Sequence, residues 1–242
     1  MDIKFSWQEY GEILDLYSDR LKSFTEARGA SEFVILRHDV EFNVARALKM
    51  AQIEKSRGVK STFFFQVMSN AYNPFSIKNH DAIHIINNMG HSVGLHAYIS
   101  HLDAPSSSIL DKELKKQKNI FENGLEIDCL SFSFHRPPMW ALEIRKDEMC
   151  NMINAYGPSF FELSRHPEHI KYVADSMHTW SYGHPLDNSE RNKMQILVHP
   201  DEWSEDGDKN LVEFFNKLKN EHSLQFVNTL NDETKHYGKH KE

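Results

Sequence analysis

Four apolar segments of the sequence are each followed by residues that can bind a metal ion or transfer a proton. The segments are residues 34–36, 92–95, 130–134 and 196–198, and the residues that follow them include Asp39, Glu41, His96, His101, His135 and His199. Converging carboxylates and imidazoles are the usual ligands of Zn²⁺ and similar ions, and imidazole transfers protons near neutral pH. A single histidine at a strand end more often has a structural role, but four such ends favour a shared site. The pattern indicates a metal-dependent hydrolase or a related site.

These segments can share a site only if they are strands of one mostly parallel sheet. Apolar runs of strand length alternate with helical periodicity, which is typical of an α/β fold. Strands are expected at 33–36, 61–67, 91–95, 129–134, 193–198 and 223–227, and short ones around 160–161 and 178–180 within the irregular segment 137–192. Helices are expected from the capping box at 6–9 onward and at 43–57, 75–89, 108–122 and 210–220. The carboxyl ends of parallel strands lie on one rim, where ligands bind.

The bulk properties fit one globular domain. A length of 242 residues with 40% hydrophobic residues suits a single domain spanning 1–242, in which residues 1–30 form an N-terminal helical extension. The net charge of −7 and the lack of a dense basic cluster argue against a nucleic-acid partner. No apolar run is long enough to predict a membrane span.

The expected location is the cytoplasm. Asp2, Glu9 and Glu12 occupy the N-terminal stretch, where a signal peptide needs a basic start and an apolar segment. Cys129 and Cys150 could form one disulfide, but two thiols in a chain of this length fit a reducing compartment better.

The motifs around the candidate residues resemble a known family. Arg-His-Asp-Val-Glu at 37–41, Gly-His-Ser-Val-Gly-Leu-His at 90–96, His-Arg-Pro at 135–137 and Leu-Val-His-Pro at 197–200 occur in this order. Together they resemble the successive motifs of the polysaccharide deacetylases, which are also called the NodB-homology group or carbohydrate esterase family 4 (CE4). The resemblance extends from about residue 33 to about residue 204. The resemblance implies a distorted (β/α)7-type barrel. It also implies a metal-dependent hydrolase that removes N-acetyl groups from an acetamido sugar.

The resemblance also implies roles for individual residues. By the motif match, Asp39 is the general base, Glu41 and His96 are metal ligands, and Arg136 orients the base. His199 protonates the departing amine, and Asp175 orients His199. The expected substrate contacts are Trp180, Trp203 and Tyr98, and either tryptophan could form the apolar wall that holds the acetyl methyl.

Two departures from the family pattern concern the metal ligands. The family usually has Asp where this chain has Glu41, and its second histidine ligand usually falls four residues after the first, which here is Ser100. A shift of one residue to His101 reverses the side chain if the backbone is extended, so His135 is the alternative ligand. The donor set suits Zn²⁺, with Co²⁺, Ni²⁺ and Fe²⁺ as alternatives.

Three functions remain open at the level of sequence. The first is deacetylation of a carbohydrate precursor in surface polysaccharide (O-antigen or capsule) biosynthesis. The second is an amidohydrolase of the same fold that acts on a non-sugar C–N bond. The third is a catalytically degenerate barrel that binds a sugar or a partner, which the changes at Glu41 and His101 motivate. Neither the exact substrate nor the oligomeric state follows from the sequence.

Overall fold

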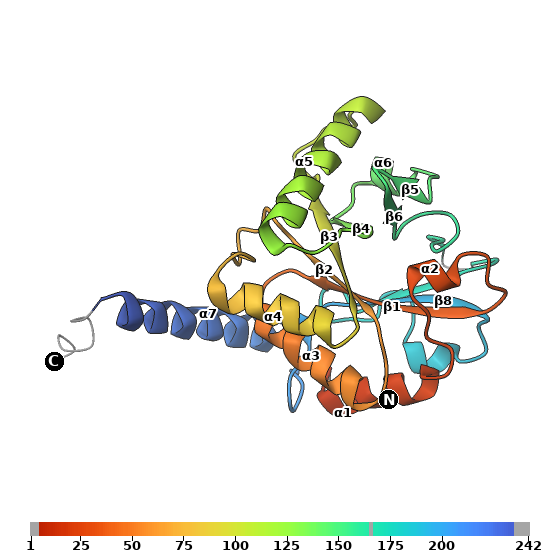
Figure 1. The fold of residues 1–242 in the computed structure, drawn as a ribbon. Coiled ribbons are helices and arrows are strands. Elements are labelled where there is room, and N and C mark those ends of the chain that lie inside the picture. Colours follow the sequence, from red (N-terminus) through yellow and green to blue (C-terminus); the bar gives the residue numbers. More distant parts are fainter. Residues whose placement is uncertain (1–4, 165–166, 235–242) are drawn as a thin grey trace.

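The computed structural model describes residues 5–164 and 167–234 of the chain. One eight-stranded sheet organises this part of the molecule (Figure 1). Its strands are β1 Phe33–Val40, β2 Thr62–Phe65, β3 Ser92–Tyr98, β4 Ser131–His135, β5 Glu148–Met149, β6 Met152–Asn154, β7 Lys171–Ala174 and β8 Lys193–Val198. The helices are α1 Trp7–Tyr17, α2 Phe24–Ala27, α3 Val44–Ser56, α4 Ile77–Asn88, α5 Ser107–Leu125, α6 Met139–Leu142 and α7 Leu211–Glu233, with 3-10 turns η1 Pro185–Asn188 and η2 Pro200–Glu202. None of the described helices is long and apolar enough to cross a bilayer.

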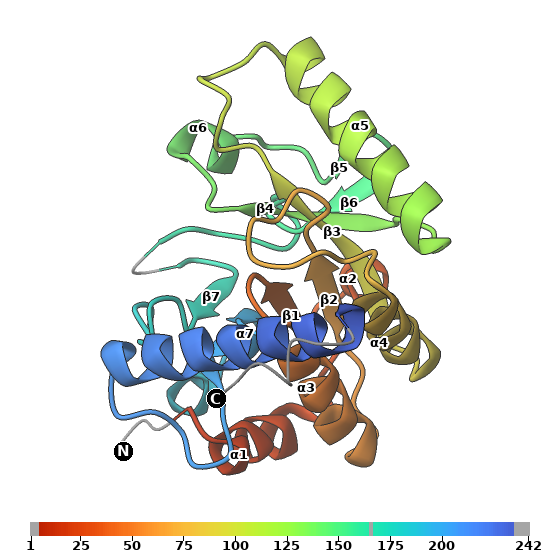
Figure 2. The ribbon, with the colours of Figure 1, turned by 90° about the vertical axis from the view of Figure 1, so that its left-hand side faces the viewer.

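The strand order is that of a barrel that has opened along one side. The order across the sheet is β5-β6-β4-β3-β2-β1-β8-β7, and every described pair is parallel except β5 with β6. β1 to β4 are therefore adjacent in space in the order of the sequence, and β8 lies beside β1, as in a β/α barrel. Figure 2 shows the arc from β5 and β6 through β3, β2 and β1 to β7. The predicted α/β fold with a distorted barrel is confirmed as a curled, mostly parallel half-barrel.

Aromatic rings span the opening between the β5–β6 hairpin and β7. The ring of Phe161 lies 4.9 Å from that of Tyr156, which follows β6, and 5.0 Å from that of Tyr172 on β7. On the β8 side, the amide of Gln195 donates to the carbonyl oxygens of Ala155 and Phe160, each at 2.9 Å. Side chains therefore close this part of the wall, where strand pairing does not.

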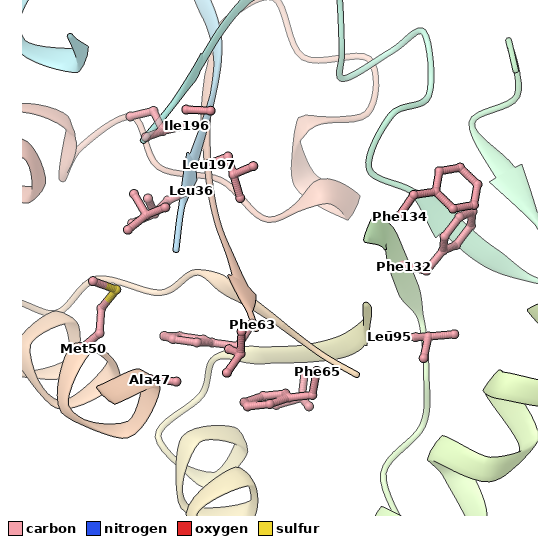
Figure 3. Close-up of a cluster of buried hydrophobic side chains, with 14 of the residues drawn as sticks. Leu36, Ala47, Met50, Phe63, Phe65, Leu95, Phe132, Phe134, Ile196 and Leu197 are labelled. Carbon is pink, nitrogen blue, oxygen red and sulfur yellow. The ribbon is translucent and has the colours of Figure 1, made fainter. Parts of the chain in front are cut away.

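The outer face of the sheet packs against helices. Alternate residues of β1, among them Leu36, face the side that α3 covers with Ala47 and Met50, and Phe63 and Phe65 of β2 join the same apolar cluster (Figure 3). Because α3 begins at Asn43, whose side chain accepts hydrogen bonds from Ala45 N and Arg46 N, its start is fixed directly after β1.

His38 lies on this outer side of β1 and is fully buried. Its Nε2 is 2.7 Å from the carboxylate of Glu54, which also accepts hydrogen bonds from the hydroxyls of Tyr10 and Ser61. His38 is therefore a buried, hydrogen-bonded histidine on the face of β1 opposite to Asp39.

The inner face of β1 changes from apolar to polar along the strand. Phe33 and Ile35 belong to a second apolar cluster that includes Phe24 of α2, and these residues close the amino-terminal end of the half-barrel. Arg37 and Asp39 follow on the same face because side chains alternate along a strand. The carboxyl-terminal end of the half-barrel is thus the polar end.

Most of the predicted elements are confirmed, with differences of a few residues at their ends, but three predicted strands are wrong. Residues 223–227 continue α7, in which Leu224 and Phe226 are exposed, so their alternation with polar residues reflects no buried strand face. Residues 160–161 and 178–180 lie in turns and irregular backbone, and the strand of this region is β7. The extension predicted for residues 1–30 includes α1 and α2, and α1 begins at Ser6, whose hydroxyl accepts the Glu9 N–H.

Candidate metal centre and its cavity

Three side chains from three strands meet at the polar end of the half-barrel. Glu41 follows β1, His96 lies on β3 and His135 ends β4. The Glu41 Oε1 lies 2.8 Å from His135 Nδ1 and 3.4 Å from His96 Nε2, and the two ring nitrogens are 3.2 Å apart. One carboxylate oxygen and two imidazole nitrogens facing a common point form a donor set that fits Zn²⁺ or a related divalent ion.

His101 lies outside this cluster. The strand β3 ends at Tyr98, and His101 stands in the turn that follows, exposed and stacked on the Tyr98 ring at 6.0 Å. His135 takes the third position because its strand partner in the parallel register is Tyr98, two residues beyond His96. Of the two sequence candidates for the third ligand, the geometry brings His135 to the site.

The orientation of His96 is set by a relay of hydrogen bonds. The Ser133 hydroxyl donates to Asp39 Oδ1 at 3.0 Å, so its oxygen accepts from His96 Nδ1 at 2.7 Å. This places the proton of the neutral ring on Nδ1 and leaves the lone pair of Nε2 toward Glu41, as a metal ligand requires. Ser133 was not predicted from the sequence, although its position two residues before His135, on the same face of β4, was a usable signal.

The environment favours the ionised form of Glu41. Burial opposes ionisation, but the contacts with His135 and His96 outweigh it and hold the pKa of Glu41 well below its usual range. An ionised carboxylate beside two imidazoles is the charge state that a divalent ion needs.

Asp39 lies beneath this cluster and is held by Arg37. Both side chains are almost fully buried, and Arg37 Nη2 is 3.3 Å from Asp39 Oδ2 and 2.7 Å from the Tyr156 hydroxyl. Burial raises the pKa of Asp39, but Arg37, and then His96 and His199, outweigh it and keep the pKa below its usual value. Asp39 is therefore a carboxylate able to accept a proton.

Arg136 occupies a different place from the one that its motif implied. It lines the cavity with a left-handed backbone at φ 47°, and no hydrogen bond or ion pair joins it to Asp39 in the described part of the chain. Arg37, two residues before Asp39 on the same face of β1, makes that contact. Arg37 was not predicted from the sequence as a site residue, although the alternation of side chains along β1 places it on the same face as Asp39.

His199, which follows β8, pairs with Asp175, which follows β7. The Nδ1 of His199 lies 2.7 Å from Asp175 Oδ1, and the backbone N–H of His199 donates to both carboxylate oxygens at 3.0 Å. Burial lowers the pKa of His199, but Asp175 outweighs burial and raises it to about 10. The pair fits a histidine that carries a proton to be donated, as the motif match predicts.

The three aromatic residues predicted as substrate contacts lie away from the cavity wall. Trp203 is fully buried and its indole N–H donates to Asp175 Oδ2 at 2.7 Å, which fixes the carboxylate beside His199. Trp180 is also buried, and Tyr98 stacks between His101 and His135. Among the described residues that line the cavity none of these three appears. Trp203 therefore contacts the site through Asp175.

The cavity that joins these groups has a volume of about 700 Å³. This volume is within the size range of small-molecule sites. The cavity is lined by Asp39, Glu41, His96 and His199, among others. Asp201, a further lining residue that the sequence analysis missed, accepts hydrogen bonds from the backbone N–H groups of Glu41 and Phe42 at 3.2 and 3.1 Å. Burial raises its pKa to about 7.

Comparison with known proteins finds similar solved structures. No protein-family model and no curated protein matches the sequence. Similar structures include a CE4 family pseudoenzyme from Bacillus anthracis (17% identity, 79% of this chain and 62% of that chain, TM-score 0.47). Others are the chitin deacetylase of Colletotrichum lindemuthianum (19%, 78% and 80%, TM-score 0.42) and a polysaccharide deacetylase of Bacillus cereus (14%, 78% and 86%, TM-score 0.45). The chain spans less than two thirds of the length of the pseudoenzyme. The three solved structures are of polysaccharide deacetylases, the family that the sequence motifs resemble, and of a pseudoenzyme of that family.

Proposed function

We propose that this protein is a divalent-metal-dependent hydrolase that removes the acetyl group from the nitrogen of an acetamido sugar. The observation that carries the proposal is that Asp39, Glu41, His96 and His199 line one cavity. Glu41 and His96 belong to the Glu41–His96–His135 donor set, and Asp39 and His199 belong to polar pairs with Arg37 and Asp175.

The roles in this proposal follow from the contacts. Glu41, His96 and His135 would hold the metal ion, which supplies a Lewis acid for the acyl oxygen and lowers the pKa of a bound water. Asp39 takes a proton from the attacking water, and Arg37 and Ser133 fix its two oxygens in place. His199 gives a proton to the departing nitrogen, and Asp175 holds its ring.

The proposed substrate is a small carbohydrate precursor of a surface polysaccharide, and the proposed location is the cytoplasm. Both cysteines of the chain are free thiols, which supports a reducing compartment. Hydrolysis of a non-sugar C–N bond and sugar binding without catalysis are the alternative outcomes of the test.

The test begins with metal content, measured by elemental analysis of the wild type and three variants. We expect near-stoichiometric divalent metal in the wild type, its loss in His96→Ala and His135→Ala, and its retention in the matched control His101→Ala. Acetate release from acetamido sugars is then measured, and Asp39→Asn is expected to keep the metal but lose about 10²–10⁴-fold in rate.

Each alternative has its own signature in this experiment. Metal loss in His101→Ala with retention in His135→Ala would refute the assigned ligands. A metal-loaded protein that opens a ureide ring but releases no acetate would be an amidohydrolase of another kind. A wild type that takes up neither Zn²⁺ nor Co²⁺ would be a binding protein.

A further inference from the structure

Four exposed apolar side chains gather around the mouth of the cavity. Met139, Leu163, Met177 and Phe215 are exposed by 63%, 40%, 65% and 42%, and all four line the cavity. We call them the apolar rim. They come from α6, the segment after Phe161, the turn after β7, and α7. Single exposed apolar residues are ordinary on a protein surface, but four that line the same cavity mark a binding surface.

The turn that carries Met177 is held in place. Met177 and His178 have left-handed backbones, with φ values of 60° and 56°, which cost free energy in residues with a Cβ. His178 fixes this turn, because its Nδ1 lies 2.8 Å from Glu202 Oε2 and its ring stacks on Phe214 at 5.7 Å. The neighbour of Phe214 is Phe215, so one set of contacts orders two members of the apolar rim.

The cavity lining offers few cationic side chains to a polyanionic substituent. The described lining contains no lysine, and its one guanidinium is that of Arg136. A diphosphate, as in a nucleotide sugar, would therefore find one cationic side chain there apart from the ligand cluster and His199.

We propose that the substrate is an acetamido sugar joined to an apolar group, an alkyl or isoprenoid chain, and that this chain lies on the apolar rim. This inference rests on the proposed function and names the substrate class of the same site. The sugar then occupies the polar end near His96 and His199, and burial of the chain against the rim supplies affinity that the sugar alone lacks.

The test compares the binding of three probes to the zinc-loaded protein: the methyl glycoside of N-acetylglucosamine, its octyl glycoside, and UDP-N-acetylglucosamine. The octyl glycoside is kept below its critical micelle concentration. Binding is measured by calorimetry and hydrolysis by acetate release. We expect the octyl glycoside to bind about tenfold or more tightly than the methyl glycoside. The variant Phe215→Ser should remove most of this preference, and Phe226→Ser, an exposed site on the same helix, should keep it.

The outcomes separate this inference from the proposed function. Preferential binding of the octyl glycoside that depends on Phe215 without acetate release would support the apolar rim and refute the deacetylase activity. Equal binding of the two glycosides, an octyl preference that Phe215→Ser leaves intact, or tighter binding of UDP-N-acetylglucosamine would each overturn the inference.

Discussion

At the scale of residues, the inner face of β1 contains much of the site in one alternating series. Phe33 and Ile35 are apolar, Arg37 and Asp39 form a buried pair, and Glu41 reaches the ligand cluster. The sequence predicted Asp39 and Glu41 because carboxylates after an apolar run stand out. Arg37 was missed because a buried arginine is interpretable only with its partners. One of these, the hydroxyl of Tyr156, comes from a segment whose structure the sequence left open.

The His199–Asp175 pair predicts how stability depends on pH. Burial lowers the pKa of His199, but Asp175 outweighs burial and raises it from 6.5 to about 10. The folded protein therefore binds this proton more tightly than the unfolded chain does. The stabilisation is complete below pH 6.5 and is lost as pH rises through about 10. We expect Asp175→Asn to destabilise the metal-free protein by about 2 kcal/mol or more near neutral pH, and by less near pH 10.

Urea unfolding of the wild type and Asp175→Asn across this pH range, with a chelator present, measures the effect. A difference in the free energy of unfolding that stays constant or grows with pH would contradict the assignment of the raised pKa to this pair.

At the scale of elements, α7 is joined to the site through Arg46 of α3. The guanidinium donates to the backbone carbonyls of Asp201 and Trp203, which lie just after His199, and it pairs with Glu221 of α7. Beyond this attachment α7 projects away from the sheet (Figure 1). The sequence predicted the start of α7 from its Asn210 cap but placed a strand in its second half. Leu224 and Phe226 there are exposed, so their alternation with polar residues did not indicate a buried face of either structure.

We expect Arg46→Met to destabilise the fold by about 2–3 kcal/mol, because it leaves buried carbonyls without their charged donor. Acetate release should also slow, since the carbonyl groups concerned belong to the turn that follows His199. Thermal unfolding and initial rates measure the two effects. The matched control is Arg57→Met, whose ion pair with Asp15 is largely exposed and should contribute less than about 1 kcal/mol. Equal losses in the two variants would show that Arg46 has no special structural role.

At the scale of the whole molecule, the sequence predicted the strands of the sheet well where strand and helix alternate. Strands at 33–36, 61–67, 91–95 and 193–198 carry the apolar runs that a covered parallel sheet requires, so a shared rim at their carboxyl ends followed. The segment 137–192 was predicted poorly because its strands are short and its packing depends on rings that meet only in the folded chain. Phe161 illustrates this, since its contacts with Tyr156 and Tyr172 join elements on both sides of the opening.

Substitution of Phe161 tests how far these rings stabilise the fold. Phe161 is 2% exposed, and Phe161→Ala should destabilise the protein by about 3–5 kcal/mol because it removes a buried ring at the gap. Phe226→Ala, at a position that is 64% exposed, should change the stability by less than about 0.5 kcal/mol. Denaturant midpoints measure both. A loss in Phe161→Ala as small as that in the control would mean that the rings do not hold the opening closed.

The open side of the half-barrel also determines how the molecule can change in evolution or design. A strand is difficult to remodel because its register fixes every side chain along it. The wall between the β5–β6 hairpin and β7 consists of side chains, including Tyr156, Phe161, Tyr172 and Tyr182, which all line the cavity. Substitutions of Tyr172 and Tyr182 can widen, narrow or recharge the cavity and leave the sheet and the ligand cluster in place. The shape of this side of the cavity and the ligand cluster are therefore set by separate parts of the chain, and one can be altered while the other is kept.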